Sequence, residues 1–196
     1  MKMRRSVVVG VGAVMVMVLA ASGVALAMTI NCIPNTTCNG TNNNDTINGT
    51  SVSDGMHGLA GNDLMRGKGG GDEMRGGKGA DKVLGGLDGD AFLWGGVETT
   101  NSTFPDKSDD TVKGALGNDS IEGGFGQGGV DHVFGDDGND TIVVAQRGFP
   151  FGDVKVTKEV VDCGAGDDTV YRDKGKDVIA NNCEHKKRGF PIQMAP

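Results

Sequence analysis

The chain has 196 residues, 35 of them glycine, and a net charge of −7 at neutral pH. Its 26 acidic residues are mostly Asp, and helices tolerate Glu better than Asp and tolerate Gly worst of all residues except Pro, so the composition excludes a mainly helical protein. The acidic balance also argues against nucleic acid as a partner, because no basic stripe is present to neutralise phosphates.

The first 27 residues differ in kind from the rest. Three basic residues within the first five positions precede a long uncharged run, and Ala25-Leu26-Ala27 places small residues at the two positions that signal peptidase reads. This pattern predicts a secretory signal peptide over 1–27, cleaved after Ala27, and hence a secreted protein. An uncleaved membrane anchor is the alternative, because the run approaches spanning length. Removal would change the net charge from −7 to −10.

After the signal segment, aspartate recurs every nine residues over a long stretch. A glycine lies five residues before each of these aspartates, and an apolar residue lies two residues after each. The three registers move together, which neither low-complexity coincidence nor a flexible glycine-rich linker explains. The aspartates are Asp45, Asp54, Asp63, Asp72, Asp81 and Asp90, and the apolar residues are Ile47, Met56, Met65, Met74, Val83 and Phe92.

The same register returns after interruptions. Within each of three later pairs the spacing is again nine residues, whereas one turn near 123–129 carries three extra residues and larger breaks fall at 94–108 and 144–161. A repeat that resumes in the same form is typical of a solenoid, in which insertions lie on the turns. The later aspartates are Asp110, Asp119, Asp131, Asp140, Asp168 and Asp177.

These units resemble the repeat of bacterial RTX (haemolysin-type) calcium-binding proteins, G-G-x-G-x-D-x-U-x, where U is a large apolar residue. The unit "GGKGADKVL" at 76–84 matches in full, whereas "GKGGGDEMR" at 67–75 and "GLAGNDLMR" at 58–66 depart at the second position. The resemblance covers about 40–142 and again 163–183. It implies an all-β fold, a parallel β-roll (β-solenoid) of nonapeptide repeats, in which two units complete one coil and residues eighteen apart stack.

Stacked carboxylates about 4.8 Å apart repel one another, and a bound cation resolves that conflict. Calcium takes six to eight oxygen ligands, whereas magnesium demands a stricter octahedron, and the histidines and cysteines lack the spacing of a zinc site. The resemblance implies Ca2+ between stacked turns, as in Asp45/Asp63 and Asp72/Asp90. Beyond the twelve aspartates above, the glycines implied in these metal sites are Gly58, Gly61, Gly67, Gly70, Gly76 and Gly79.

The apolar register, including Phe92, is expected to point inward and form a core one residue thick per strand. Such a core is too thin to offset the conformational entropy of ordering the chain, so metal binding is expected to contribute the remainder. Two units depart from the pattern, because Val52 and Asp88 replace the third glycine before Asp54 and Asp90. Sites that use Asp54 or Asp90 therefore match the repeat pattern less well than the others.

Four cysteines in an exported chain suggest two disulfides, with three possible connectivities. We favour Cys32–Cys38 and Cys163–Cys183, the second because twenty residues is close to one coil. The predicted organisation is an N-terminal disulfide cap over 28–39, a calcium-binding roll over 40–143 with an insertion at 94–108, a continuation and C-terminal disulfide cap over 144–184, and a loose tail over 185–196.

Two functions remain open. The first is a non-catalytic, monomeric roll whose partners are calcium ions and a component of the cell surface or matrix, with a structural or adhesive role. The second is an accessory fragment of a secreted toxin or hydrolase whose catalytic domain lies elsewhere. The sequence contains neither H-E-x-x-H nor G-x-S-x-G, which favours the non-catalytic alternative.

Overall fold

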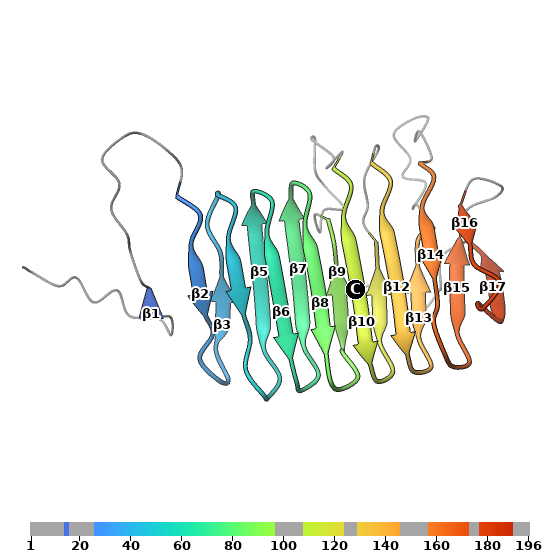
Figure 1. Ribbon diagram of the computed structural model, residues 1–196, viewed down its shortest axis with the longest axis horizontal. Helices are drawn as coiled ribbons and strands as arrows, with labels where there is room; N and C mark the ends of the chain where they lie inside the picture. Colours follow the sequence, from blue (N-terminus) through green and yellow to red (C-terminus); the bar gives the residue numbers. More distant parts are fainter. Residues whose placement is uncertain are drawn as a thin grey trace, which may run out of the picture.

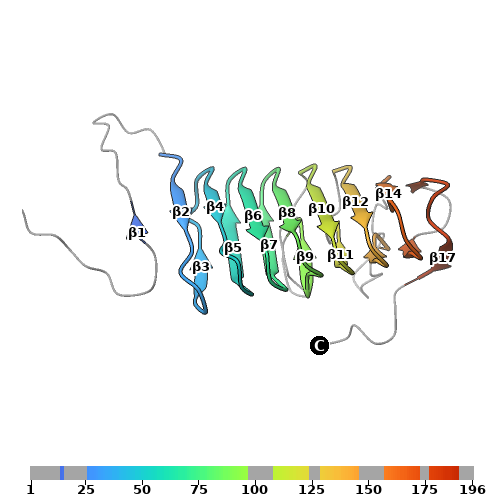
Figure 2. The same cartoon turned by 60° about the horizontal axis from the view of Figure 1, so that its bottom comes forward.

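Strands alternate between two facing β-sheets as the chain winds from one end of the molecule to the other (Figures 1 and 2). The computed structural model describes residues 14–15, 26–96, 108–123, 129–145, 157–172 and 177–189. Apart from the first strand, neighbouring strands in both sheets are parallel. The predicted parallel β-roll is therefore confirmed.

From β2 onward, each sheet takes every second strand of the chain. The first sheet contains β1 (Val14–Met15), β2 (Thr29–Asn31), β4 (Thr46–Asn48), β6 (Leu64–Lys68), β8 (Lys82–Gly86), β10 (Thr111–Leu116), β12 (His132–Asp137), β14 (Val160–Asp162) and β16 (Val178–Ile179). The second sheet contains β3 (Thr37–Asn39), β5 (Gly55–Ala60), β7 (Glu73–Lys78), β9 (Phe92–Trp94), β11 (Ser120–Glu122), β13 (Thr141–Val143), β15 (Thr169–Arg172) and β17 (His185–Arg188).

The strand register explains the nine-residue period. Ile47 pairs with Met65, and Met65 pairs with Val83, so two units make one coil and residues eighteen apart are neighbours. The same register continues across the interruptions, because Val83 pairs with Val112 and Val112 pairs with Val133. The extra residues therefore leave the stacking of the coils unchanged.

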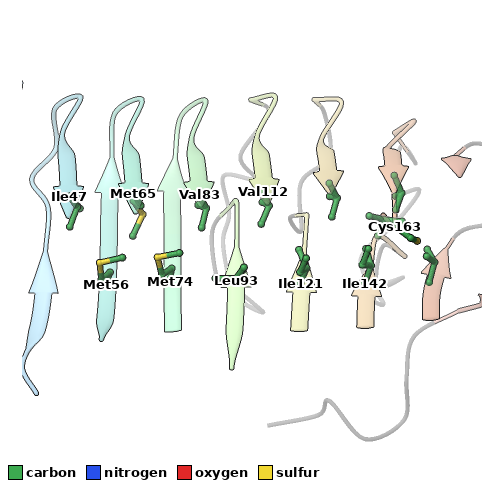
Figure 3. Packing of buried hydrophobic residues seen from close by; sticks show 14 of the residues in the cluster. Ile47, Met56, Met65, Met74, Val83, Leu93, Val112, Ile121, Ile142 and Cys163 are labelled. Atoms are coloured by element: carbon green, nitrogen blue, oxygen red, sulfur yellow. The ribbon is translucent and has the colours of Figure 1, made fainter. Parts of the chain in front are cut away.

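One row of apolar side chains from each sheet fills the space between the sheets (Figure 3). In β4 only the central residue is buried, which matches the predicted core of one residue per strand. The strands β9, β11 and β13 also bury their last residue. Phe92 is an exception to the prediction. Leu93, not Phe92, pairs with Met74 and is fully buried, whereas Phe92 pairs with Glu73 and is half-buried. The unit before β9 therefore contains one more residue than the nine-residue pattern.

Near the ends of β5, β6, β10 and β12, the second position of the repeat unit is a non-glycine residue in the left-handed region. The φ angles are +81° at Leu59, +83° at Lys68, +84° at Ala115 and +68° at Asp136. Matching units carry glycine there, with φ of +113° at Gly77. A side chain in this region costs about 1 to 2 kcal/mol, so the backbone is strained at the positions where the sequence departs from the repeat.

Replacing Ala115 with Gly should therefore stabilise the folded chain. The expected gain is about 0.5 kcal/mol, because relief of the left-handed strain is partly offset by the greater freedom of glycine in the unfolded chain. The midpoint of urea unfolding in millimolar calcium measures the change. Ala165→Gly is the matched control, since Ala165 has no positive φ, and it should lower the midpoint. Equal effects of the two substitutions on the unfolding midpoint would contradict the explanation that the backbone at Ala115 is strained.

Disulfides occur at both ends of the roll, with the connectivity that the sequence analysis favoured. Cys32 bonds Cys38, which places a short loop between β2 and β3, and Cys163 bonds Cys183, whose Cα atoms lie 5.2 Å apart. The first bond links the residue after β2 to β3, and the second links the residue after β14 to the segment between β16 and β17. Such cross-links limit the unfolded chain where the roll has fewest neighbouring coils.

The C-terminal tail differs from the prediction. Residues 185–196 were expected to be loose, but His185–Arg188 form β17, which pairs in parallel with β15 over four residues. All four side chains of β17 are exposed. Charged residues on an edge strand discourage pairing with another chain, so this strand ends the second sheet with a basic edge.

Within the predicted signal peptide, the described residues include β1, which pairs antiparallel with β2. None of the described residues forms a helix of the length and apolar character needed to cross a bilayer. Most of the signal segment, residues 97–107 of the predicted insertion and the end of the tail lie outside the described residues.

Candidate metal site

The predicted aspartates line up in two columns that run along the roll, one at the start of each sheet's strands. The first carboxylate column contains Asp45, Asp63, Asp81, Asp110, Asp131, Glu159 and Asp177. The second carboxylate column contains Asp54, Asp72, Asp90, Asp119, Asp140, Asp168 and Glu184. The structure thus brings together every stacked pair that the sequence analysis named.

Apart from Asp54, whose Oδ1 accepts no hydrogen bond, the carboxylates of the columns link their own coil to the preceding one. The backbone N–H of Asp63 donates a hydrogen bond to Oδ1 of Asp81 at 2.8 Å, and the N–H of Asp54 donates to Oδ1 of Asp72 at 2.8 Å. The pattern crosses the interruptions, since the N–H of Asp90 donates to Oδ1 of Asp119 at 2.7 Å. One oxygen of each of these carboxylates therefore has a protein partner on the neighbouring coil.

The other carboxylate oxygen has no such partner in most of the roll. The aspartates in the columns are buried, at most 4% exposed, apart from Asp131 and Asp177, which are half-buried. A buried carboxylate oxygen without a hydrogen bond is costly, and a cation is the partner that would satisfy it. The described residues with a buried Oδ2 that accepts no hydrogen bond include Asp63, Asp72, Asp90, Asp119, Asp140 and Asp168.

Burial makes the charged form of these groups unfavourable. It raises the pKa to about 7 for Asp90 and Asp119, and to about 6 for Asp63, Asp72 and Asp140. The backbone hydrogen bond from the preceding coil lowers each pKa in part, and the neighbouring carboxylates raise it further. At neutral pH the columns therefore carry negative charge that the protein alone stabilises poorly.

Glycines set the space around the second oxygen. A Cβ on Gly67 would lie 2.0 Å from Oδ2 of Asp72 and 2.5 Å from the carbonyl oxygen of Gly85, and Gly58 has the same relation to Asp63 and Gly76. The predicted glycines Gly61, Gly70 and Gly79 instead lie in the left-handed region. The first glycine of a unit thus leaves room for a carboxylate oxygen and a carbonyl oxygen side by side.

Asparagines form a second ladder in the turns, which the sequence analysis missed. The N–H of Asn62 donates to Oδ1 of Asn44 at 2.8 Å, and the N–H of Asn139 donates to Oδ1 of Asn118 at 2.8 Å. This ladder runs opposite to the aspartate ladder, because here the later coil donates. The sequence signal for this ladder is the Asn that often precedes the repeat aspartate. These asparagine side chains connect stacked turns and so fix the distance between them.

Two glutamates in the columns were also missed. Oε2 of Glu159 accepts the N–H of Asp131 at 2.8 Å, and Oε2 of Glu184 accepts the N–H of Asp168 at 3.0 Å. Glu159 lies eighteen residues before Asp177 and two before the buried Val161, so the repeat register identifies it once Glu is allowed in place of Asp. Glu184 lacks the following apolar residue and gives no such signal.

The donor set fits a hard cation. Buried carboxylate oxygens and turn carbonyls are the ligands that Ca2+ prefers. Within the described ranges, no group of three or more His, Cys, Asp or Glu side chains converges on one point. An ion held here would therefore combine carboxylates from stacked aspartates with backbone carbonyls, and it would supply the positive charge that the columns lack.

The comparisons with known proteins agree with this geometry. A family model described as the RTX calcium-binding nonapeptide repeat (4 copies) matches residues 39–74, 57–92, 106–142 and 162–179, which together make up more than half of the chain. The comparison with curated proteins found no match, and neither did the comparison with solved structures. The stacked aspartates, the parallel roll and the family match lead to one conclusion: this chain belongs to the family of RTX calcium-binding nonapeptide-repeat proteins.

Proposed function

We propose that this protein is an exported calcium-binding roll without catalytic activity, which folds when it meets calcium outside the cell and has a structural or adhesive role at the cell surface or in the matrix. The observation that carries the proposal is the row of buried Oδ2 atoms that accept no hydrogen bond, as at Asp72 and Asp119. A folded state with these charges becomes favourable when cations satisfy them.

The ions would lie between turns stacked in one column. The carboxylate of Asp72 accepts a hydrogen bond from the backbone N–H of Asp54 on the preceding coil. The backbone N–H of Asp72 in turn donates to the carboxylate of Asp90 on the following coil. Asp72 therefore takes part in two successive turn-to-turn junctions. Extracellular calcium modules bind with dissociation constants of about 10⁻⁴ to 10⁻³ M, which suits a protein that meets abundant calcium only after export.

Export is supported by two features of the chain. The predicted signal peptide over 1–27 directs the chain out of the cytoplasm and would leave residues 28–196 as the mature protein. Both disulfides are of the kind that forms in oxidising compartments, and each closes one end of the roll.

Replacing Asp72 with Asn tests the proposed calcium sites. The substitution removes one charge from two junctions and should weaken calcium binding by roughly tenfold or more, because calcium affinity depends on the number of charged ligands. Isothermal titration calorimetry measures both affinity and stoichiometry, and the apparent stoichiometry should fall.

Asp88→Asn is the matched control. Asp88 lies on the coil after Asp72 and is exposed, and its Oδ2 accepts the N–H of Gly70 at 2.8 Å, which an amide oxygen can also do. The control removes the same charge outside the columns and should weaken binding far less than Asp72→Asn, because Asp88 acts on Asp72 and Asp90 only through its charge. Equal calcium binding by all three proteins would count against the proposed sites.

A further inference from the structure

The outer face of the first sheet carries a group of basic side chains on its central strands. Arg66 and Lys68 lie on β6, Lys82 on β8 and Lys113 on β10, and these strands are direct neighbours (Figure 1). Because Met65, Val83 and Val112 face the core, the residues beside them in each strand face outward. The basic face, as we call these four residues, is thus a cationic surface on a chain of net charge −7, with Lys68 and Lys82 exposed and the other two half-buried.

Among the described residues, no ion pair joins the basic face to a carboxylate, although β12 places Asp136 beside Ala115 and Asp137 beside Leu116. The side chain of Lys68 donates to the carbonyl oxygen of Gly49 at 2.6 Å, and Nη1 of Arg66 lies 3.5 Å from Oδ1 of Asn48. Lys113 lies 4.3 Å from the centre of the Phe134 ring. The second sheet differs, because there Arg75 forms an ion pair with Glu73.

A shallow, largely apolar depression lies beside Arg66 and Lys68. It has a volume of about 410 Å³ and is lined by Arg66, Lys68, Leu84, Leu87 and Leu116, together with the small residues between them. Leu87 is 68% exposed and Leu116 is 43% exposed. A contiguous exposed apolar patch rimmed by polar residues is typical of protein or membrane interaction sites.

We propose that this face docks on the surface of an anionic lipid bilayer, with Leu87 and Leu116 entering the headgroup region and the basic face contacting lipid phosphates. The cations are spread over three strands about 4.8 Å apart rather than converging on one point, so they match distributed charge better than a single small anion. Leucines between the cations match an amphiphile better than a purely polar acidic polymer. The inference rests on the proposed function, because the face exists only in the folded roll.

The test is co-sedimentation of residues 28–196, the predicted mature chain, with lipid vesicles. The predicted signal segment is left out because its own apolar run would bind lipid. Circular dichroism first identifies the calcium concentration at which this chain is folded, and binding is measured in that state. We expect binding to vesicles of equal parts phosphatidylcholine and phosphatidylglycerol, and little binding to pure phosphatidylcholine.

Two double variants probe the face, and a third is the matched control. Arg66→Gln with Lys82→Gln should weaken binding roughly thirtyfold, given the usual contribution of each cation near an anionic surface. Leu87→Ser with Leu116→Ser should weaken it roughly tenfold or more through lost apolar burial. Lys186→Gln with Lys187→Gln removes the same charge from β17 and should leave binding unchanged.

The outcomes separate the two proposals. Equal binding to both kinds of vesicle, or equal loss in the control, overturns the docking face. Loss in the charge variant alone, with the leucine variant unaffected, also overturns it, because the surface would then recognise charge without a bilayer. Binding that follows calcium and is unchanged in the charge variant shows calcium bridging and overturns it too. A chain that is fully folded without calcium contradicts the proposed function instead, and vesicle binding is then measured in that state.

Discussion

Without calcium, the chain should be most stable near pH 4 and should lose its β-structure as the pH rises towards 7. The unfolded carboxylates have a pKa of 3.8, whereas burial raises the folded pKa to about 7 for Asp90 and Asp119. Below pH 3.8 both states are protonated, so no charge opposes burial. Between pH 3.8 and about 7 the unfolded chain releases protons that the folded chain still holds, so stability falls across that window and the loss is complete once the pH exceeds the folded pKa.

Calcium should reverse this dependence. A cation that satisfies the ionised columns stabilises the folded chain at neutral pH, and protons should compete with it as the pH falls. Circular dichroism at pH 4 to 8, with chelator or with millimolar calcium, measures both effects. At pH 7 the chain should show nearly full β-structure with calcium and almost none with chelator.

Substitutions in the second carboxylate column provide the control for the pH response. Asp90→Asn with Asp119→Asn removes the two groups with the highest pKa and should flatten the response of the metal-free chain. Asp88→Asn with Asp167→Asn removes two exposed charges near the same column and should leave most of it. A metal-free wild-type chain that is equally structured at pH 4 and pH 7 would contradict this explanation.

The sequence predicted the fold because its period is the period of the structure. A carboxylate every ninth residue and an apolar residue two positions later correspond to the column and the core of each coil, as Asp63 and Met65 show. The same reasoning predicted which aspartates stack within the uninterrupted stretch. It did not say which coils meet across the insertions, since a loop of any length can leave the register unchanged, as between Asp81 and Asp110.

The sequence-based predictions were wrong or incomplete at positions where the structure departs from a strict nine-residue period. Phe92 satisfies the spacing, but one extra residue in the turn brings Leu93 into the core instead. Glu159 lies in the first carboxylate column because its longer side chain still reaches the N–H of Asp131. The strand at His185–Arg188 has no apolar residue to mark it, and its backbone pairing with β15 depends on the end coil being present. Backbone pairing has no sequence signal of its own.

Replacing Gly67 with Ala should strongly destabilise the roll. The new Cβ would lie 2.5 Å from the carbonyl oxygen of Gly85, which β8 holds in place against β6, and 2.0 Å from Oδ2 of Asp72. Moving the carboxylate would disturb the hydrogen bond between Oδ1 of Asp72 and the N–H of Asp54. Overpacking of this kind costs about 3 kcal/mol. Urea unfolding in millimolar calcium measures the loss.

Gly55→Ala separates this close approach from any general effect of losing a glycine. The nearest atom to a Cβ on Gly55 is Oγ1 of Thr37 at 4.0 Å, so the methyl group has room and should change stability by less than about 1 kcal/mol. Gly67→Ala should also weaken calcium binding, because the methyl group occupies the place where the carboxylate and carbonyl oxygens meet, whereas Gly55→Ala should not. A Gly67→Ala chain with unchanged stability and calcium affinity would show that the first glycine of a unit is not needed for this arrangement of oxygens. The prediction therefore tests why the repeat begins with glycine: the residue makes room for the charge on which the fold depends.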